Sequence, residues 1–283
     1  VSSLFAGDYD PEMVAFIVEK ICESLSNAAE RLEPASFAYT ESAEPQFIRN
    51  RLLNIDSLTD GALQTLHFRQ ESGDVLFSVY GAHATLLDKT NHQLSADYPG
   101  YFNTSLKQHA NVHFSSFAAG AVGNMGYRTA KSADPFFFGK NLAAEVEYPE
   151  YYMDTVSLLS FQIPLVLPQP QFRVGDHLVL RPIWFEKFFG RYSATISVAK
   201  IDKTIILGMP CDFSGELAVP LKKFAAQKGY QLIITSFNGG YIGYVSPDKW
   251  YDLDKYETRT MNWYGYGMGE YFTSLVEEII IAL

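Results

Sequence analysis

The alternation of strands and helices in residues 195–283 constrains the fold of this chain more than any other feature. The predicted elements in this region are strands at 195–198, 204–207 and 232–235, and helices at 214–227 and 269–283. The helix at 214–227 is predicted despite Pro220, which could kink it or mark a later start. Alternating strands and helices of this length are typical of α/β units, in which helices cover the faces of a sheet.

The first part of the chain predicts a similar mixture of elements. Apolar residues recur at helical spacing after Pro11, with acidic residues near the start, which predicts a helix over 11–32. The other predicted elements, in chain order, are strands at 62–68 and 75–80, a helix at 99–109, a strand at 112–119, a helical patch at 141–146, and strands at 156–166 and 172–180, the last with a turn at 174–176. A turn over 71–74 joins the first two of these strands.

We therefore expect an α/β fold with mixed sheets flanked by helices. The 283 residues, 47% of them hydrophobic, suffice for one large core or two modest ones. The sequence contains no internal repeat, low-complexity tract or linker, so we expect a single domain over residues 1–283.

Charge and composition exclude several classes of protein. The formal net charge of -10, without any basic run, argues against nucleic acid as a partner. Two cysteines, Cys22 and Cys211, cannot form a disulfide framework. No apolar stretch reaches the roughly 20 residues that a membrane span needs. The chain begins at Val1 with neither an initiator Met nor a signal peptide, and we expect it to be a piece of something longer.

Polar side chains that can bind a metal follow an apolar strand in the first half of the chain. His83 lies three positions after the end of the predicted strand 75–80, and His92, Asp97 and Tyr101 follow within eighteen positions. Zinc binds imidazole nitrogen and carboxylate oxygen, and a catalytic zinc site needs three or four protein ligands. The spacing fits no short zinc signature, so a hydrogen-bonded loop histidine is the alternative for His83.

Three other candidates have simple structural interpretations as alternatives. His109 and His113 have the i, i+4 spacing of a helical zinc pair but lack the glutamate after the first histidine, which favours a helix-to-strand junction. Asp212, between a strand and a helix, could be a metal ligand or an N-cap. Cys211 is a candidate nucleophile, but a small buried thiol is the commoner outcome.

Tyrosines and glycines gather in the last part of the chain. Tyr241, Tyr244 and Tyr256 could form part of a site or pack as an ordinary aromatic cluster. The glycines around the first two indicate a tightly bent loop. Arg51 is most simply a solvated surface charge.

Taken in order, these segments resemble the neutral/alkaline (non-lysosomal) ceramidase family of zinc-dependent amidases. The anchors are Asn50-Arg51, the strand ending at His83, Asn91-His92, Ser95-Ala96-Asp97 with Gly100-Tyr101, Gly123-Asn124, Gly208 to Phe213, Tyr241-x-Gly243-Tyr244, and Tyr256-Glu257. They occur in the family's order over some 200 residues.

The chain departs from the family pattern at three places. Gly126 stands where the family has a serine that helps to hold the amide substrate, and Asp212 stands where it has a zinc-binding glutamate. The family's first zinc-binding histidine lies upstream of where this chain begins. We therefore expect a ceramidase-like catalytic domain that lacks its N-terminal part.

The resemblance implies a function as well as a fold. Zinc would be held by His83, Asp212 and Tyr244, together with the upstream histidine. Arg51 and Tyr256 would hydrogen-bond the oxyanion formed when water attacks the N-acyl amide bond of ceramide or a related N-acyl lipid. The family is exported, and its lipid substrate suggests peripheral contact with a membrane surface. Two alternatives remain open: a zinc amidase with a non-ceramide N-acyl substrate, and a non-catalytic lipid- or glycan-binding relative.

Overall fold

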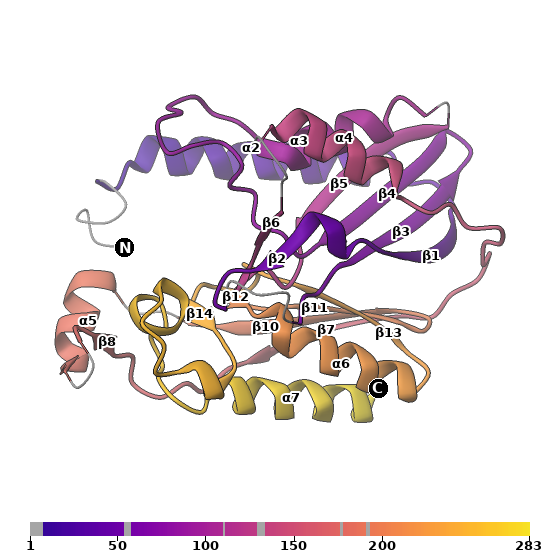
Figure 1. Ribbon diagram of the computed structural model, residues 1–283. Helices are drawn as coiled ribbons and strands as arrows, with labels where there is room; N and C mark the ends of the chain where they lie inside the picture. The colour runs from indigo at the N-terminus through magenta and orange to yellow at the C-terminus, as the bar shows by residue number, and fades with distance from the viewer. Residues whose placement is uncertain (1–7, 54–57, 110, 129–133, 176–177, 191–192) are drawn as a thin grey trace.

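Two four-stranded sheets stacked face to face form the centre of the computed structural model (Figure 1). Helices cover the outer face of each sheet, so the order of layers is helix, sheet, sheet, helix. The structure describes residues 8–53, 58–109, 111–128, 134–175, 178–190 and 193–283. The predicted α/β class, with mixed sheets flanked by helices, is confirmed.

The first sheet has the order β1-β3-β4-β5 and is built from the first half of the chain. Its strands are β1 (Ser36–Ala43), β3 (Ala62–Gln70), β4 (Gly73–Tyr80) and β5 (Val112–Ala119). The β3–β4 hairpin predicted from the turn residues is present, and β4 pairs with β5 in parallel. The crossover between these parallel strands carries helix α3 (Asp97–Leu106), which packs with α4 (Pro135–Ala144) over the outer face.

The second sheet has the order β13-β11-β10-β7. Its strands are β7 (Leu158–Pro164), β10 (Thr195–Ile201), β11 (Thr204–Gly208) and β13 (Gln231–Thr235). Helix α6 (Gly215–Gln227) connects the parallel strands β11 and β13, and α7 (Met268–Ala282) packs beside it. Pro220 lies inside α6 without ending it, so the predicted helix over 214–227 is confirmed.

The residues between the two sheets follow the two-residue period of a strand. In β4, Phe77 and Val79 point to the second sheet, whereas Leu76 and Tyr80 belong to the core beneath α3 and α4. In β13, Ile233 faces the first sheet and its two neighbours face the helices. A strand covered on both faces requires a continuous apolar run, which explains the Leu-Ile-Ile-Thr sequence of β13.

Helix α2 (Pro11–Ala29) confirms the predicted N-terminal helix and begins as expected. Its N-cap Asp10 accepts hydrogen bonds from the backbone N–H groups of Glu12 and Met13, and Pro11 occupies the first turn. None of its residues is buried, however, and its apolar residues are exposed at Met13, Val14, Phe16, Ile17, Val18, Ile21 and Leu25. No helix among the described residues is both long and apolar enough to cross a membrane.

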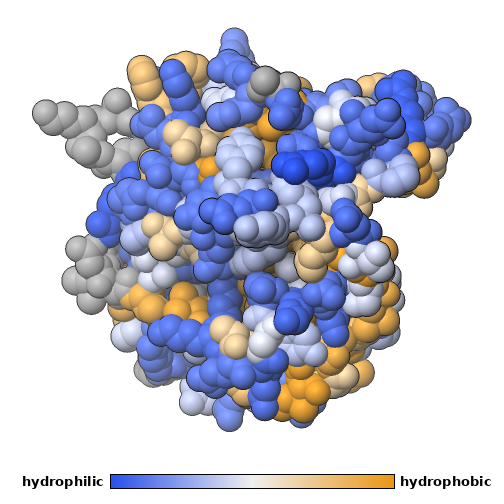
Figure 2. Space-filling view, turned by 90° about the vertical axis from the view of Figure 1, so that its right-hand side faces the viewer, coloured by the Kyte–Doolittle hydropathy of each residue, from blue (hydrophilic) through white to orange (hydrophobic). Residues whose placement is uncertain are grey.

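Smaller elements lie around the ends of the two sheets. These are η1 (Pro45–Phe47), β2 (Ile48–Asn50), β6 (Met125–Tyr127), β8 (Phe172–Arg173), β9 (Val179–Leu180), α5 (Pro182–Phe189), β12 (Asp212–Phe213), β14 (Tyr244–Val245), η2 (Asp248–Trp250) and η3 (Tyr256–Thr260). Strands β8 and β9 pair antiparallel within the segment 172–180, for which the sequence predicts a strand with a turn at 174–176; residue 176 lies outside the described residues. Figure 2 shows one side of the molecule, where hydrophilic side chains cover most of the face and apolar ones gather near its lower edge.

Candidate functional site

The candidate site lies where the parallel strands of both sheets end. His83 follows β4, and Asp212 follows β11 after a short loop. Tyr244 comes from the segment after β13 and pairs with Asp212 in the parallel bridge between β12 and β14. The carboxyl ends of parallel strands are where open α/β sheets place their chemistry, because the connecting loops converge there.

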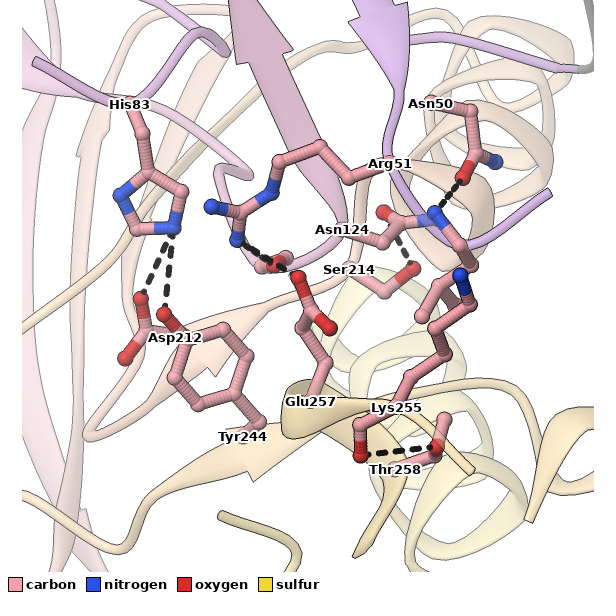
Figure 3. A network of polar contacts seen from close by, with 12 residues as sticks. Asn50, Arg51, His83, Asn124, Asp212, Ser214, Tyr244, Lys255, Glu257 and Thr258 are labelled. Carbon is pink, nitrogen blue, oxygen red and sulfur yellow. Dashed lines mark hydrogen bonds and ion pairs between the residues drawn. The ribbon is translucent and has the colours of Figure 1, made fainter. Parts of the chain in front are cut away.

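The side chains of His83, Asp212 and Tyr244 point toward one another (Figure 3). The Nε2 atom of His83 lies 3.2 Å from Oδ1 of Asp212 and 3.4 Å from the hydroxyl of Tyr244. The Asp212 side chain is only 3% exposed and that of His83 13%. Three residues separated by up to 161 positions along the chain thus present one nitrogen and two kinds of oxygen to a single point.

Tyr241 makes a contact that sequence reasoning did not assign. Its hydroxyl donates a hydrogen bond of 2.7 Å to Oδ2 of Asp212, the oxygen that does not face His83. The only signal in the sequence is its place in the Tyr241-x-Gly243-Tyr244 element, since a tyrosine three positions before another is common in packed loops.

Arg51 is held beside this cluster and is not a solvated surface charge. Its Nη2 atom lies 2.9 Å from the carbonyl oxygen of Gly123 and 3.1 Å from Oε1 of Glu257. The Arg51 side chain is 26% exposed and the Glu257 side chain 8%. The solvated alternative for Arg51 is therefore wrong, because a buried carboxylate partner holds the guanidinium in place.

Tyr256 and Glu257 both come from η3, a short π-helix. The ring of Tyr256 meets that of Tyr244 edge to face, with centroids 5.7 Å apart, and Tyr256 is 55% exposed. Glu257 points the other way, into the protein, toward Arg51 (Figure 3). π-Helical turns are frequent at functional sites, but the sequence of this segment gives no sign of one.

A buried polar network connects the loop after β5 with the start of α6. Asn124 Oδ1 accepts hydrogen bonds from the Ser214 hydroxyl at 2.9 Å and from the backbone N–H of Gly215 at 3.1 Å. Ser214 is the N-cap of α6 and binds the backbone N–H of Glu216. The N-cap interpretation of Asp212 is therefore wrong, because Ser214 fills that role and leaves the Asp212 carboxylate to the cluster.

The tyrosines of the cluster are held in their protonated form. Burial raises the pKa of Tyr244 well above its ordinary value, and the Asp212 carboxylate raises it further. The pKa of Tyr241 is raised for the same two reasons. The Cys211 thiol is fully buried, and burial also raises its pKa, so it is a packing residue rather than a nucleophile.

Two solved structures are similar to this chain over nearly its whole length. One, described as neutral ceramidase from Pseudomonas aeruginosa, superposes with a TM-score of 0.74 at 16% identity and covers 94% of this chain. The other, described as ceramidase complexed with C2, has a TM-score of 0.72 at 15% identity and covers 91%. This chain has the fold of the neutral ceramidases.

The similarity to these ceramidase structures covers only part of their length. The chain spans 55% of the length of each of these ceramidase structures. No protein-family model matches it, and no curated protein does. The resemblance read from the sequence is therefore confirmed at the level of the ceramidase fold.

The cluster contains two kinds of donor that zinc accepts, an imidazole nitrogen and a carboxylate oxygen. No three His, Cys, Asp or Glu side chains gather at one point within the part of the chain that the structure describes. The cluster reaches three donors only when the Tyr244 hydroxyl joins His83 and Asp212.

Other residues named in the sequence lie away from the cluster or have structural roles. His92 is exposed in the loop before α3. Asp97 accepts hydrogen bonds from the backbone N–H groups of Leu87 and Tyr98, which explains its acidic side chain without a metal. His109 follows the end of α3 and His113 lies in β5, so the helix-to-strand interpretation of this pair is confirmed.

A cleft of about 700 Å³ opens between the two sheets close to the cluster. Its walls include Phe77 and Ala118 from the first sheet and Phe161 and Val198 from the second. Phe237 lines the cleft and also contacts the His83 ring, with centroids 6.4 Å apart. The cleft therefore offers an apolar space next to the polar cluster.

Proposed function

We propose that this chain forms part of a zinc-dependent hydrolase that cleaves the N-acyl amide bond of ceramide or a related N-acyl lipid. The observation that carries the proposal is the meeting of His83, Asp212 and Tyr244 at one point in a neutral ceramidase fold. Bound zinc would supply a Lewis acid and lower the pKa of a coordinated water toward neutrality. An exported location, with peripheral contact to a membrane surface, is part of the same proposal.

The residues around the cluster have complementary roles in this proposal. His83, Asp212 and Tyr244 would hold the metal. Arg51 lies beside them with its guanidinium fixed by Gly123 and Glu257, so it can donate to a developing oxyanion without first being ordered. The hydroxyl of Tyr256, whose ring packs on that of Tyr244, would be the second donor.

The cleft supports a substrate with an apolar chain. Its aromatic and aliphatic walls would remove such a chain from water, which contributes about 0.8 kcal/mol per buried methylene. An apolar chain that enters between the sheets would end beside Phe237 and His83.

A second candidate substrate class is favoured by Gly126. The side chain of Arg51 occupies the space beside this glycine. The ceramidase family that the sequence resembles has at this position a serine that helps to hold the substrate. Loss of that hydroxyl favours an N-acyl substrate other than ceramide, cleaved by the same zinc chemistry.

The proposal is tested by replacing His83 with alanine and measuring both zinc content and amide hydrolysis. After dialysis against a weak chelator, the unmodified protein should retain about one zinc per chain, as expected for one catalytic site. His83→Ala should lose both the metal and hydrolysis of short- and long-chain ceramides and other N-acyl lipids.

The matched control is His92→Ala, since His92 is an exposed histidine in the following loop. It should keep zinc and activity. Zinc and hydrolysis that survive in His83→Ala would contradict the proposed site. A well-folded unmodified protein without zinc would favour the non-catalytic binding relative instead.

A further inference from the structure

The two oxygens of the buried Asp212 carboxylate have different partners. Oδ1 faces His83 Nε2 at 3.2 Å, whereas Oδ2 accepts the Tyr241 hydroxyl at 2.7 Å. We propose that Tyr241 is a positioning residue that fixes Asp212 so that Oδ1 alone is presented to the metal. This inference rests on the proposed zinc site.

The backbone around Tyr241 is fixed by close contacts. Gly239 and Gly240 have φ values of +70° and +121°, and a Cβ at either would come within 2.4 Å of a backbone oxygen. The neighbouring Ile242 donates its backbone N–H to the carbonyl of Pro210 at 2.8 Å. Only glycine is compatible with this backbone conformation at residues 239 and 240. The conformation brings the loop that carries Tyr241 against the segment that carries Asp212.

The ring of Tyr241 is fixed as well. It meets the ring of Trp263 edge to face, with centroids 5.5 Å apart and planes at 90°, and it lies against Phe237 on another side. A donor on a rigid aromatic ring loses little conformational entropy when it forms a hydrogen bond. The Tyr241 hydroxyl therefore restrains the rotation of the Asp212 carboxylate through this hydrogen bond.

The hydrogen bond between Tyr241 and Asp212 is of a kind that can orient a carboxylate. A neutral hydroxyl that donates to a carboxylate forms a strong, short hydrogen bond. A carboxylate restrained in this way offers one oxygen to a metal and cannot turn to present both. Groups that hydrogen-bond to a metal ligand without touching the metal orient that ligand. Their removal typically weakens metal binding by about 10–100-fold.

Tyr241→Phe tests the inference because it keeps the ring and removes only the hydroxyl. We expect the dissociation constant for Zn²⁺, measured by competition with a chromophoric chelator, to rise by about 10–100-fold. The visible absorption bands of bound Co²⁺ should also shift, because they report the ligand geometry and a purely structural role would leave them unchanged.

Tyr266→Phe is the matched control, since Tyr266 is 71% exposed. It should bind Zn²⁺ and Co²⁺ like the unmodified protein. A Tyr241→Phe variant with a dissociation constant within twofold of the unmodified protein and the same Co²⁺ bands would overturn the positioning role.

The zinc site itself is checked separately with His83→Ala. Loss of Zn²⁺ in His83→Ala but not in Tyr241→Phe would leave the proposed function standing and overturn only the role of Tyr241. An unmodified protein that binds no Zn²⁺ would overturn both.

Discussion

At the scale of single residues, the absence of a side chain at Gly126 determines where Arg51 lies. Gly126 pairs with Arg49 between β2 and β6, and it lies against Arg51, two positions further along that segment. A Cβ at this position would lie 2.8 Å from Cδ and 3.0 Å from Cγ of Arg51. Any side chain at residue 126 must therefore displace the arginine from its place beside Glu257.

Gly126→Ala should consequently reduce hydrolysis by misplacing Arg51. A shift of about 1 Å in a positioned group can cost about 100-fold in rate, so we expect kcat/KM for the preferred N-acyl substrate to fall by up to that factor. Zinc content should not change. Gly175→Ala is the control, because a Cβ there meets nothing within 4 Å. Full activity in Gly126→Ala would show that the position of Arg51 does not matter.

At the scale of one element, strand β3 carries a histidine that is fully buried and held neutral. His67 is 0% exposed, and its Nε2 atom lies 2.8 Å from the Thr40 hydroxyl on the neighbouring strand β1. Burial, reinforced by the charge of Arg69, lowers the pKa of His67 from 6.5 to about 4. Between pH 4 and pH 6.5, His67 is therefore protonated more readily in the unfolded chain than in the folded protein.

This shift predicts that the free energy of unfolding falls as the pH is lowered from 6.5 to 4. The unfolded state holds more protons in that window, so acid favours unfolding, by an upper limit of about 3 kcal/mol from this group. His67→Gln should flatten the profile in this window, as measured by urea denaturation at a series of pH values. His113→Gln, at an exposed position in β5, should leave the profile unchanged. An equally steep profile in His67→Gln would assign the acid sensitivity to other groups.

At the scale of the whole molecule, the contact between the two sheets holds the halves of the site together. His83 follows a strand of the first sheet, whereas Asp212 and Tyr244 follow strands of the second. The residues buried between the sheets are Phe37, Leu66, Val79 and Ile233. Packing at this interface therefore contributes both to stability and to the alignment of the site.

Ile233→Ala should lower the free energy of unfolding by about 2–5 kcal/mol, because it leaves a cavity between the sheets. We expect one cooperative transition in urea, as for a single domain. Ile281→Ala, at a position of α7 that is 65% exposed, should change stability by less than about 0.5 kcal/mol. Two separate transitions would contradict the single domain that the sequence predicts.

Most long elements were predictable because their patterns are local. The period of apolar residues located α2, β3, β4, β5, α6, β13 and α7 to within a few residues. Strand β1 (Ser36–Ala43) was missed because it carries several polar residues, whose side chains find partners only in the tertiary structure. Thr40, for example, meets His67 of β3. The two-residue strands β12 and β14 exist only because each has the other as a partner, so no local pattern can reveal them.

The α/β class can be predicted from the amino-acid sequence alone, as can the order of the main elements and the candidate residues at the strand ends. Those follow from hydrophobic periodicity and from residue chemistry, both of which are properties of the chain. The folded structure is needed to show that His83, Asp212 and Tyr244 meet. It also shows the ion pair of Glu257 with Arg51 and the hydrogen bond of Tyr241 to Asp212. Contacts between residues so far apart depend on the stacking of the two sheets and on positive-φ glycine turns, and these are fixed by packing rather than by local sequence.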